Sequence, residues 1–252
     1  MLRITALLIL IFGLSPALPA ATITFSGLQW TVRAGTGGPG PNTWDPANVR
    51  VDDQGGLHLK LAHRDGRWTC AEVTSRQRFG FGRYRFVVEG TVDRWNAQVV
   101  LGLFNYPTGD VGGDGTHEID IEFARWGRAD APAGNYTIWP IDPALKPTSK
   151  TFAFSLKGTT SIHQWDWRST RVNWESAEPD RDGSPIVFQQ WTYAPDDAAR
   201  RIAQKPMPIH FNLWLFQGRP PSDGKEVEVV IRSFTFAGAD PQIPSTAPSP
   251  RP

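Results

Sequence analysis

Residues 117–123 read HEIDIEF, in which acidic and apolar side chains alternate without a break after the first histidine. Glu118, Asp120 and Glu122 share one parity, and the residues between them share the other. Because successive side chains of a strand point to opposite faces, a strand would present three carboxyl groups on one face and apolar groups on the other. A helix would spread both sets around its axis, so the pattern predicts a β-strand.

Three carboxyl groups on one strand face have chemical consequences. Like charges disfavour joint ionisation and push at least one pKa upward. The two isoleucines and Phe123 draw the opposite face into a core, so the acids are predicted to line the floor of a cleft. Separated pKa values there let one carboxyl stay ionised while another holds a proton. A solvated acidic face and an oxygen-ligand site for a hard cation are the alternatives.

The spacing of Glu118 and Glu122 is compatible with acid–base chemistry on a sugar. Their Cα atoms are expected about 13 Å apart, at about 3.3 Å per residue. If the long side chains lean toward one another, the carboxyl groups can approach to about 5 Å, the separation of a retaining glycosidase pair. An inverting pair lies roughly 6.5–9.5 Å apart. Asp120 lies between the two glutamates and can share a proton or a hydrogen bond with either.

The composition predicts an all-β protein of one large domain or two small ones. The chain has 252 residues, a net charge of +1 and a pI of about 7.9, which gives no general attraction to nucleic acid or to anionic membranes. Its 11 tryptophans suit sugar stacking as well as core filling. Many short apolar runs separated by turns, without a βαβ pattern, indicate a sandwich.

The two ends of the chain differ from its middle. Residues 1–20 carry Arg3, an apolar run and a small-residue end, which predict a signal peptide and a secreted or periplasmic protein. Residues 21–237 are predicted to form one domain, and the Pro/Ser-rich residues 238–252 a disordered tail. Cys70 is the only cysteine, so no intrachain disulfide can form, and a buried thiol is expected.

Local patterns predict the order of the elements. A hairpin is expected around the turn 53–56, and one short helix over 195–202. The segment 209–216 should bury Phe211 and Leu213 and turn Asn212 and Trp214 to the other face. The main strands are expected at 22–25, 30–34, 48–51, 57–61, 68–75, 83–89, 98–106, 135–139, 151–156, 162–167, 171–174, 186–193, 209–216 and 226–236.

Several of these segments resemble family 16 glycoside hydrolases, and they occur in the same order. EIDIE at 118–122 is similar to the active-site strand of that family. The other similar segments are NTW at 42–44, CAE at 70–72 with FGFGRY at 79–84, FNY at 104–106, the H…DW…W pattern from 163 to 174 and NLW at 212–214. The resemblance implies a β-jelly roll, a sandwich of two curved antiparallel sheets with a concave substrate cleft.

The resemblance also implies roles for single residues. Glu118 would be the nucleophile and Glu122 the acid/base, with Asp120 tuning the pair. The residues expected to bind substrate are Glu72, Phe104, Tyr106, Trp126, Asn135, Asn212 and Trp214. The implied activity is a secreted, monomeric, retaining endo-β-glycanase that hydrolyses a neutral β-glucan with 1,3-1,4 or 1,3 linkages through a covalent glycosyl-enzyme.

Two other functions remain open at this stage: a transglycosylase acting on β-glucan or xyloglucan, and a non-catalytic carbohydrate-binding jelly roll. No cofactor takes part in the implied chemistry. Many family members carry a structural calcium ion, but the last strand of this chain lacks the clear aspartate expected for it, so the metal content is unknown. No membrane association is expected after removal of the signal peptide.

The chain departs from the family pattern at three places. Family members commonly pair the cysteine of the CAE strand with an earlier cysteine, and Asn42 lies where that partner would be. They also carry a tryptophan just before the motif that stacks a sugar beside the nucleophile. Here Thr116 and His117 precede Glu118, so the stack is missing or comes from elsewhere, with Trp126 as the candidate. His117 is expected to be a buried structural histidine, and the loop 107–115 looks long.

Overall fold

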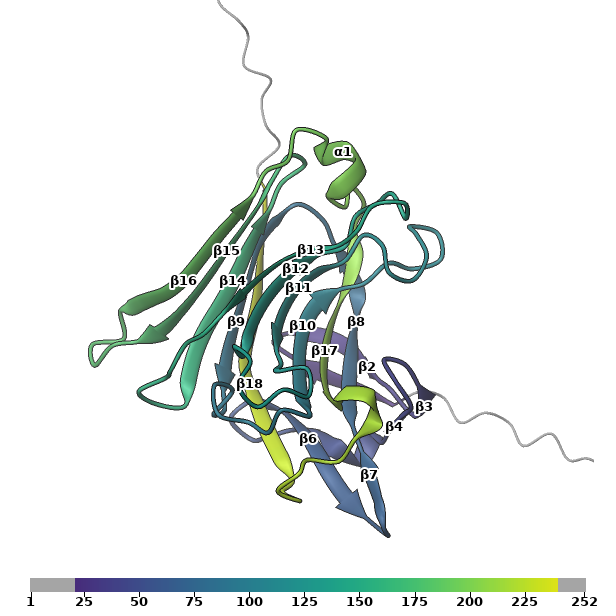
Figure 1. Cartoon of the computed structure of the whole chain (residues 1–252), viewed down its shortest axis with the longest axis vertical. Helices are drawn as coiled ribbons and strands as arrows, with labels where there is room; N and C mark the ends of the chain where they lie inside the picture. The colour runs from purple at the N-terminus through teal and green to yellow at the C-terminus, as the bar shows by residue number, and fades with distance from the viewer. Residues whose placement is uncertain (1–20, 240–252) are drawn as a thin grey trace, which may run out of the picture.

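The computed structural model describes residues 21–239, which form two large antiparallel sheets packed face to face (Figure 1). The predicted all-β jelly-roll sandwich is therefore confirmed. Residues 1–20 and 240–252 lie outside the described residues, and with them the expected signal peptide and nearly all of the tail. The last strand runs to Gly238, the residue at which the tail was predicted to begin.

The first sheet has eight strands and contains the HEIDIEF segment. In spatial order its strands are β1 (Thr22–Phe25), β2 (Leu28–Val32), β8 (Ala71–Phe79), β17 (Met207–Leu215), β10 (Val99–Asn105), β11 (Ile119–Phe123), β12 (Gly134–Ile138) and β13 (Thr148–Phe152).

The second sheet covers the back of the first. In spatial order its strands are β16 (Pro185–Tyr193), β15 (Val172–Pro179), β14 (Thr160–Trp167), β9 (Gly82–Glu89), β18 (Val227–Gly238), β6 (Leu57–Arg64) and β5 (Val49–Val51), with β7 (Arg67–Thr69) paired to β6. The remaining elements are the ribbon of β3 (Gly35–Gly37) and β4 (Asn42–Trp44), the helix α1 (Ala198–Arg201) and the short 3₁₀ helices η1 (Pro46–Asn48) and η2 (Phe216–Gly218).

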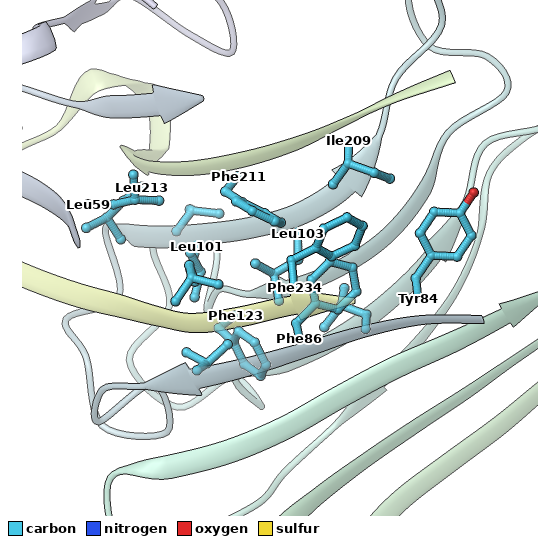
Figure 2. Close-up of a cluster of buried hydrophobic side chains, with 14 of the residues drawn as sticks. Leu59, Tyr84, Phe86, Leu101, Leu103, Phe123, Ile209, Phe211, Leu213 and Phe234 are labelled. Carbon is cyan, nitrogen blue, oxygen red and sulfur yellow. The ribbon is translucent and has the colours of Figure 1, made fainter. Parts of the chain in front are cut away.

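An aromatic core fills the space between the sheets. Phe211 on β17 packs against Phe86 on β9 and Phe234 on β18, with ring centroids 5.8 and 5.9 Å apart. Figure 2 shows these rings from the two sheets facing one another, beside Leu103 and Phe123. The predicted alternation of β17 is thus confirmed, and this core fixes which face of the first sheet remains for a cleft.

The predicted strand 68–75 is wrong in its continuity, because the chain changes sheets within it. A tight turn at Asp65 and Gly66, with φ of 50° and 74°, folds β7 back onto β6. Cys70 then forms an isolated bridge with Trp44, and β8 begins at Ala71 in the other sheet. Cys70 is fully buried, as predicted, and its burial raises the pKa of the thiol to about 12.

Other predicted boundaries are wrong as well. The strand expected at 151–156 spans Thr148–Phe152, and the strand expected at 171–174 continues to Pro179. The helix is shorter than expected, with four residues preceded by Asp197, which makes no side-chain cap bond. No helix within residues 21–239 is long and apolar enough to cross a membrane.

His117 lies outside β11, because the loop enters the strand through a backbone with φ of 63° at this residue. Its side chain is buried, as expected, and bonds to Thr116.

Candidate active site

The three acids of the motif lie on the open face of the first sheet. On β11, Asp120 and Glu122 alternate with buried apolar residues, and Glu118 comes just before the strand. The carbonyl of Glu118 accepts a hydrogen bond of 2.9 Å from the backbone N–H of Trp139, which continues the pairing with β12. All three acids line one cleft of about 920 Å³.

Two rows of side chains cross the sheet beneath this cleft, because the register aligns six strands. The row through the last glutamate contains Glu72, Asn212, Gly102, Glu122, Asn135 and Thr151. The row through the central acid contains Thr74, His210, Phe104, Asp120, Thr137 and Ser149. The register therefore gathers residues far apart in sequence around the acids.

Gly102 keeps the floor open between Glu122 and Asn212. A Cβ atom on Gly102 would lie 2.5 Å from Oδ1 of Asn212 and 3.2 Å from the ring of Phe104. Real Cβ atoms essentially never approach another atom to 2.5 Å, so any larger residue would push into the cleft or displace Asn212. The bare backbone here leaves room beside the carboxyl group of Glu122.

The pKa values of the three acids are all raised. Burial, together with the charges of Glu122, Asp114 and Glu72, raises the pKa of Glu118 to about 8, although a hydrogen bond with Asp120 acts in the opposite direction. Burial and the neighbouring Glu118 raise the pKa of Asp120, and burial and Asp120 raise that of Glu122. The cluster therefore holds protons at pH values where an ordinary carboxyl group is ionised.

The hydrogen bonds of Asp120 indicate where one proton lies. Its Oδ2 accepts a bond of 2.9 Å from the indole N–H of Trp139. Its Oδ1 is buried and meets no N–H or O–H donor among residues 21–239. A proton on Oδ1 that is donated to Glu118 satisfies both carboxyl groups and favours the ionised form of Glu118.

A second charged group lies at the β8 end of the cleft. Glu72 is buried and accepts hydrogen bonds of 2.6 Å from Arg33 and 3.1 Å from His210. Burial acts to raise the pKa of Glu72, but His210 and Arg33 outweigh it, so its pKa is lowered. Glu72 therefore stays ionised and holds both basic side chains at the cleft wall.

Aromatic side chains build the walls. Phe104 stacks on His210, with centroids 5.0 Å apart, and the Tyr106 hydroxyl donates to Asp114 at 2.9 Å. The indole N–H of Trp126 donates to the side-chain oxygen of Asn135 at 3.4 Å. Because Asn135 pairs with Glu122 across the sheet, Trp126 lies at the far end of β11 from Glu118. The expectation that Trp126 would stack beside the nucleophile is therefore wrong in its position. Trp139 lies beside Glu118 instead.

All seven residues predicted to bind substrate line the cleft, although their contacts with a sugar remain a prediction. His210 shares a face with Asn212 and Trp214 and could have been found from that pattern, whereas Arg33 gives no such signal. The lining residues that sequence reasoning missed include Arg33, Asp114, Thr137, Trp139, Ser149, Thr151 and His210.

A metal site has no clear ligand set in the part of the chain that the structure describes. No group of three or more His, Cys, Asp or Glu side chains among residues 21–239 is arranged to hold a metal ion. The structural calcium ion therefore stays an open expectation.

A hydrogen bond occupies the position at which family members commonly have a disulfide. The Cys70 thiol donates to Oδ1 of Asn42 at 3.3 Å.

Solved structures resemble this fold, whereas no protein-family profile and no curated protein matches the sequence. A β-glucanase from Bacillus licheniformis is 22% identical, with 86% of this chain and 95% of that chain covered at a TM-score of 0.61. A family 16 endo-glucanase from Bacteroides ovatus is 16% identical, with coverage of 82% and 94% and a TM-score of 0.60. A Crh5 transglycosylase is 19% identical, with coverage of 88% and 85% and a TM-score of 0.55. The chain therefore has an endo-β-glucanase-like fold of glycoside hydrolase family 16, as the motifs implied.

Proposed function

We propose that this protein is a retaining endo-β-glycanase that hydrolyses a neutral β-glucan. The observation that carries the proposal is the set of Glu118, Asp120 and Glu122 on one face of the sheet, lining a single cleft. Burial raises the pKa of Glu118 on balance, but the hydrogen bond from Asp120 acts to favour its ionised form, while burial and Asp120 favour the protonated form of Glu122. A retaining glycosidase requires one ionised and one protonated carboxyl group.

The reaction proceeds from the fraction of the protein in which Glu118 is ionised and Glu122 is protonated. The carboxylate of Glu118 attacks the anomeric carbon as the glycosidic bond breaks, and the leaving oxygen takes the proton of Glu122. This step leaves an ester between the sugar and Glu118. Glu122, now ionised, then removes a proton from water, and the hydroxide displaces Glu118 from the sugar. Both glutamates return to their starting states.

The lining of the cleft supports a neutral substrate. Five carboxyl groups face it, against the two basic side chains Arg33 and His210, and Glu72 already binds both of these. Among the described residues that line the cleft, no basic side chain is therefore left to pair with an anionic polysaccharide. Aromatic rings and amides suit the faces and hydroxyl groups of a glucan. The fold shared with β-glucanases supports 1,3-1,4 or 1,3 linkages, and the proposal of secretion rests on residues 1–20 alone.

Transglycosylation is the second candidate, because the fold is also shared with a transglycosylase. It would use the same glycosyl-enzyme, with a sugar hydroxyl group in place of water. Product analysis with excess oligosaccharide acceptor separates the two reactions. A carbohydrate-binding protein without catalysis has little support from the cleft, because both glutamates are present and face the same space.

A substrate screen tests the proposal. The purified protein would be incubated with lichenan, laminarin, xyloglucan, agarose and carrageenan, and new reducing ends would be measured. We expect cleavage of lichenan or laminarin and none of the anionic carrageenan. Glu118→Gln should abolish the activity, while Glu175→Gln, outside the cleft, should retain it. Turnover by Glu118→Gln near the wild-type rate would remove Glu118 as the nucleophile.

A further inference from the structure

Trp139 holds both ends of the pair formed by Glu118 and Asp120. It follows Ile138, the last residue of β12. Its backbone N–H donates to the carbonyl of Glu118, and its indole N–H donates to Oδ2 of Asp120, each at 2.9 Å. The indole ring is half-buried, lies beside Gly115 and lines the cleft. One residue therefore joins the cleft wall to the acids.

The direction of the indole hydrogen bond constrains the proton of Asp120. An indole N–H can only donate, so the oxygen that it meets must accept and cannot present a proton of its own to it. With Oδ2 occupied in this way, a proton on Asp120 belongs on Oδ1. This oxygen is buried and meets no donor in the described part of the chain, so a proton there is free to bond to Glu118.

We propose that Trp139 is a positioning residue that fixes the carboxyl group of Asp120 so that its proton points to Glu118. This role rests on the function proposed above. Without the indole N–H, either oxygen of Asp120 can carry the proton and the group is free to rotate. Glu118 would then lose its donor for part of the time, and its ionised form would be less favoured.

Little else near Glu118 can replace this effect. The largest effects of neighbouring charges on its carboxyl group come from acids: Glu122 on β11, Asp114 in the preceding loop and Glu72 on β8. The nearby hydroxyl of Tyr106 donates to Asp114. The nearby basic side chains Arg33 and His210 both bond to Glu72. Asp120 is therefore the donor on which Glu118 depends, and Trp139 is the donor that orients Asp120.

The pH dependence of kcat/KM for Trp139→Phe tests the proposal on a glucan that the wild type cleaves. Phenylalanine keeps an aromatic ring but lacks the N–H. We expect the acid limb to move to higher pH, by up to about 1–2 pH units, which is the strength of a hydrogen bond to a charged group. KM should change little in this variant and rise in Trp139→Ala, which also removes the ring.

Trp167→Phe is the matched control, because Trp167 lies on β14 outside the cleft and its indole N–H donates to the carbonyl of Ala203 instead of an acid. Its acid limb should stay in place. An unmoved limb in Trp139→Phe, or equal shifts in both variants, would overturn the proposal. A wild type that cleaves no glycan would instead overturn the proposed function itself.

A second pair of variants covers the case in which Trp139→Phe does not fold. Asparagine at position 120 can accept from the indole through its oxygen and donate to Glu118 through its amide nitrogen. We therefore expect the acid limb of Asp120→Asn to stay near that of the wild type and the limb of Asp120→Ala to move to higher pH. Equal shifts in these two variants would contradict the assigned direction of the hydrogen bonds.

Discussion

Replacing Glu118 with glutamine should stabilise the protein while it removes activity. Glutamine has nearly the same shape, and its side-chain oxygen can still accept a hydrogen bond from Asp120. It cannot ionise, so it avoids the cost of placing a carboxyl group among other carboxyl groups at the cleft floor. Catalytic sites commonly carry such a cost, because the arrangement that favours reaction opposes folding.

The pKa of Glu118 gives the size of the effect, because burial raises it from the ordinary 4.5 to about 8. At pH 7 the unfolded chain gains the free energy of ionising this group, whereas the folded protein keeps it mostly protonated. Each pH unit between 4.5 and 7 lowers the free energy of unfolding by about 1.36 kcal/mol, so at pH 7 this group makes the wild type roughly 3 kcal/mol less stable. For a domain of this size the variant should melt about 4–12 °C higher, allowing for some cost of a buried amide.

The sign of the effect depends on pH. Below pH 4.5 the group is protonated in both the folded and the unfolded wild type, so the variant should show no gain there. As pH rises through 4.5, the unfolded wild type releases the proton first and the folded state loses relative stability. The gain of the variant should therefore grow with pH and reach its full size near pH 8.

Urea unfolding at pH 4, 6 and 8 measures this gain as the difference in the free energy of unfolding. Glu175→Gln, on β15 in the other sheet, is the control and should show no gain that grows with pH. If Glu118→Gln is equally stabilised at pH 4 and pH 8, the charge of Glu118 is not the cause. A variant less stable than the wild type at pH 8 would refute the reasoning.

Three further substitutions test other parts of the site. Glu122→Ala should lower kcat/KM about 10²–10⁴-fold on a glucan, but much less on an aryl glycoside whose leaving group needs no proton, as paired assays would show. Gly102→Ala should cost about 1–3 kcal/mol in urea unfolding, because its Cβ atom would lie 2.5 Å from Oδ1 of Asn212. Asn42→Ala should cost about 1–3 kcal/mol in the same assay, since its side-chain amide donates to the carbonyls of Pro39 and Leu215.

The sequence predicts the floor of the cleft well, because alternation is a local property of a strand. Residues 118–123 and 209–215 each show a period of two, and the structure places one parity in the core and the other, which includes the three acids and Asn212, in the cleft. The order of family-like segments adds the fold. It also places Asn42 opposite Cys70, where the structure has a hydrogen bond.

The walls of the cleft could not be predicted, because they depend on the register between strands that are distant in sequence. Trp139 lies beside Glu118 only because β12 returns along β11 with Ile119 paired to Ile138. His210 lies near Asp120 because β10 pairs with both β11 and β17, which are separated by more than eighty residues. A single sequence gives the face of each side chain, but it does not give the partner across the sheet.

The backbone just before β11 supports the assignment of the site by a separate physical argument. Among the described residues other than glycine, five have positive φ, and four of these precede glycine, where this conformation is ordinary in a tight turn: Ser26, Asp65, Trp126 and Gln217. The exception is His117, which has a φ of 63° and is followed by Glu118. Such backbone costs about 1–3 kcal/mol and persists where the surrounding structure imposes it. Because His117 directly precedes the first acid, this cost falls on the segment that presents the carboxyl groups, as expected if selection acts on their position.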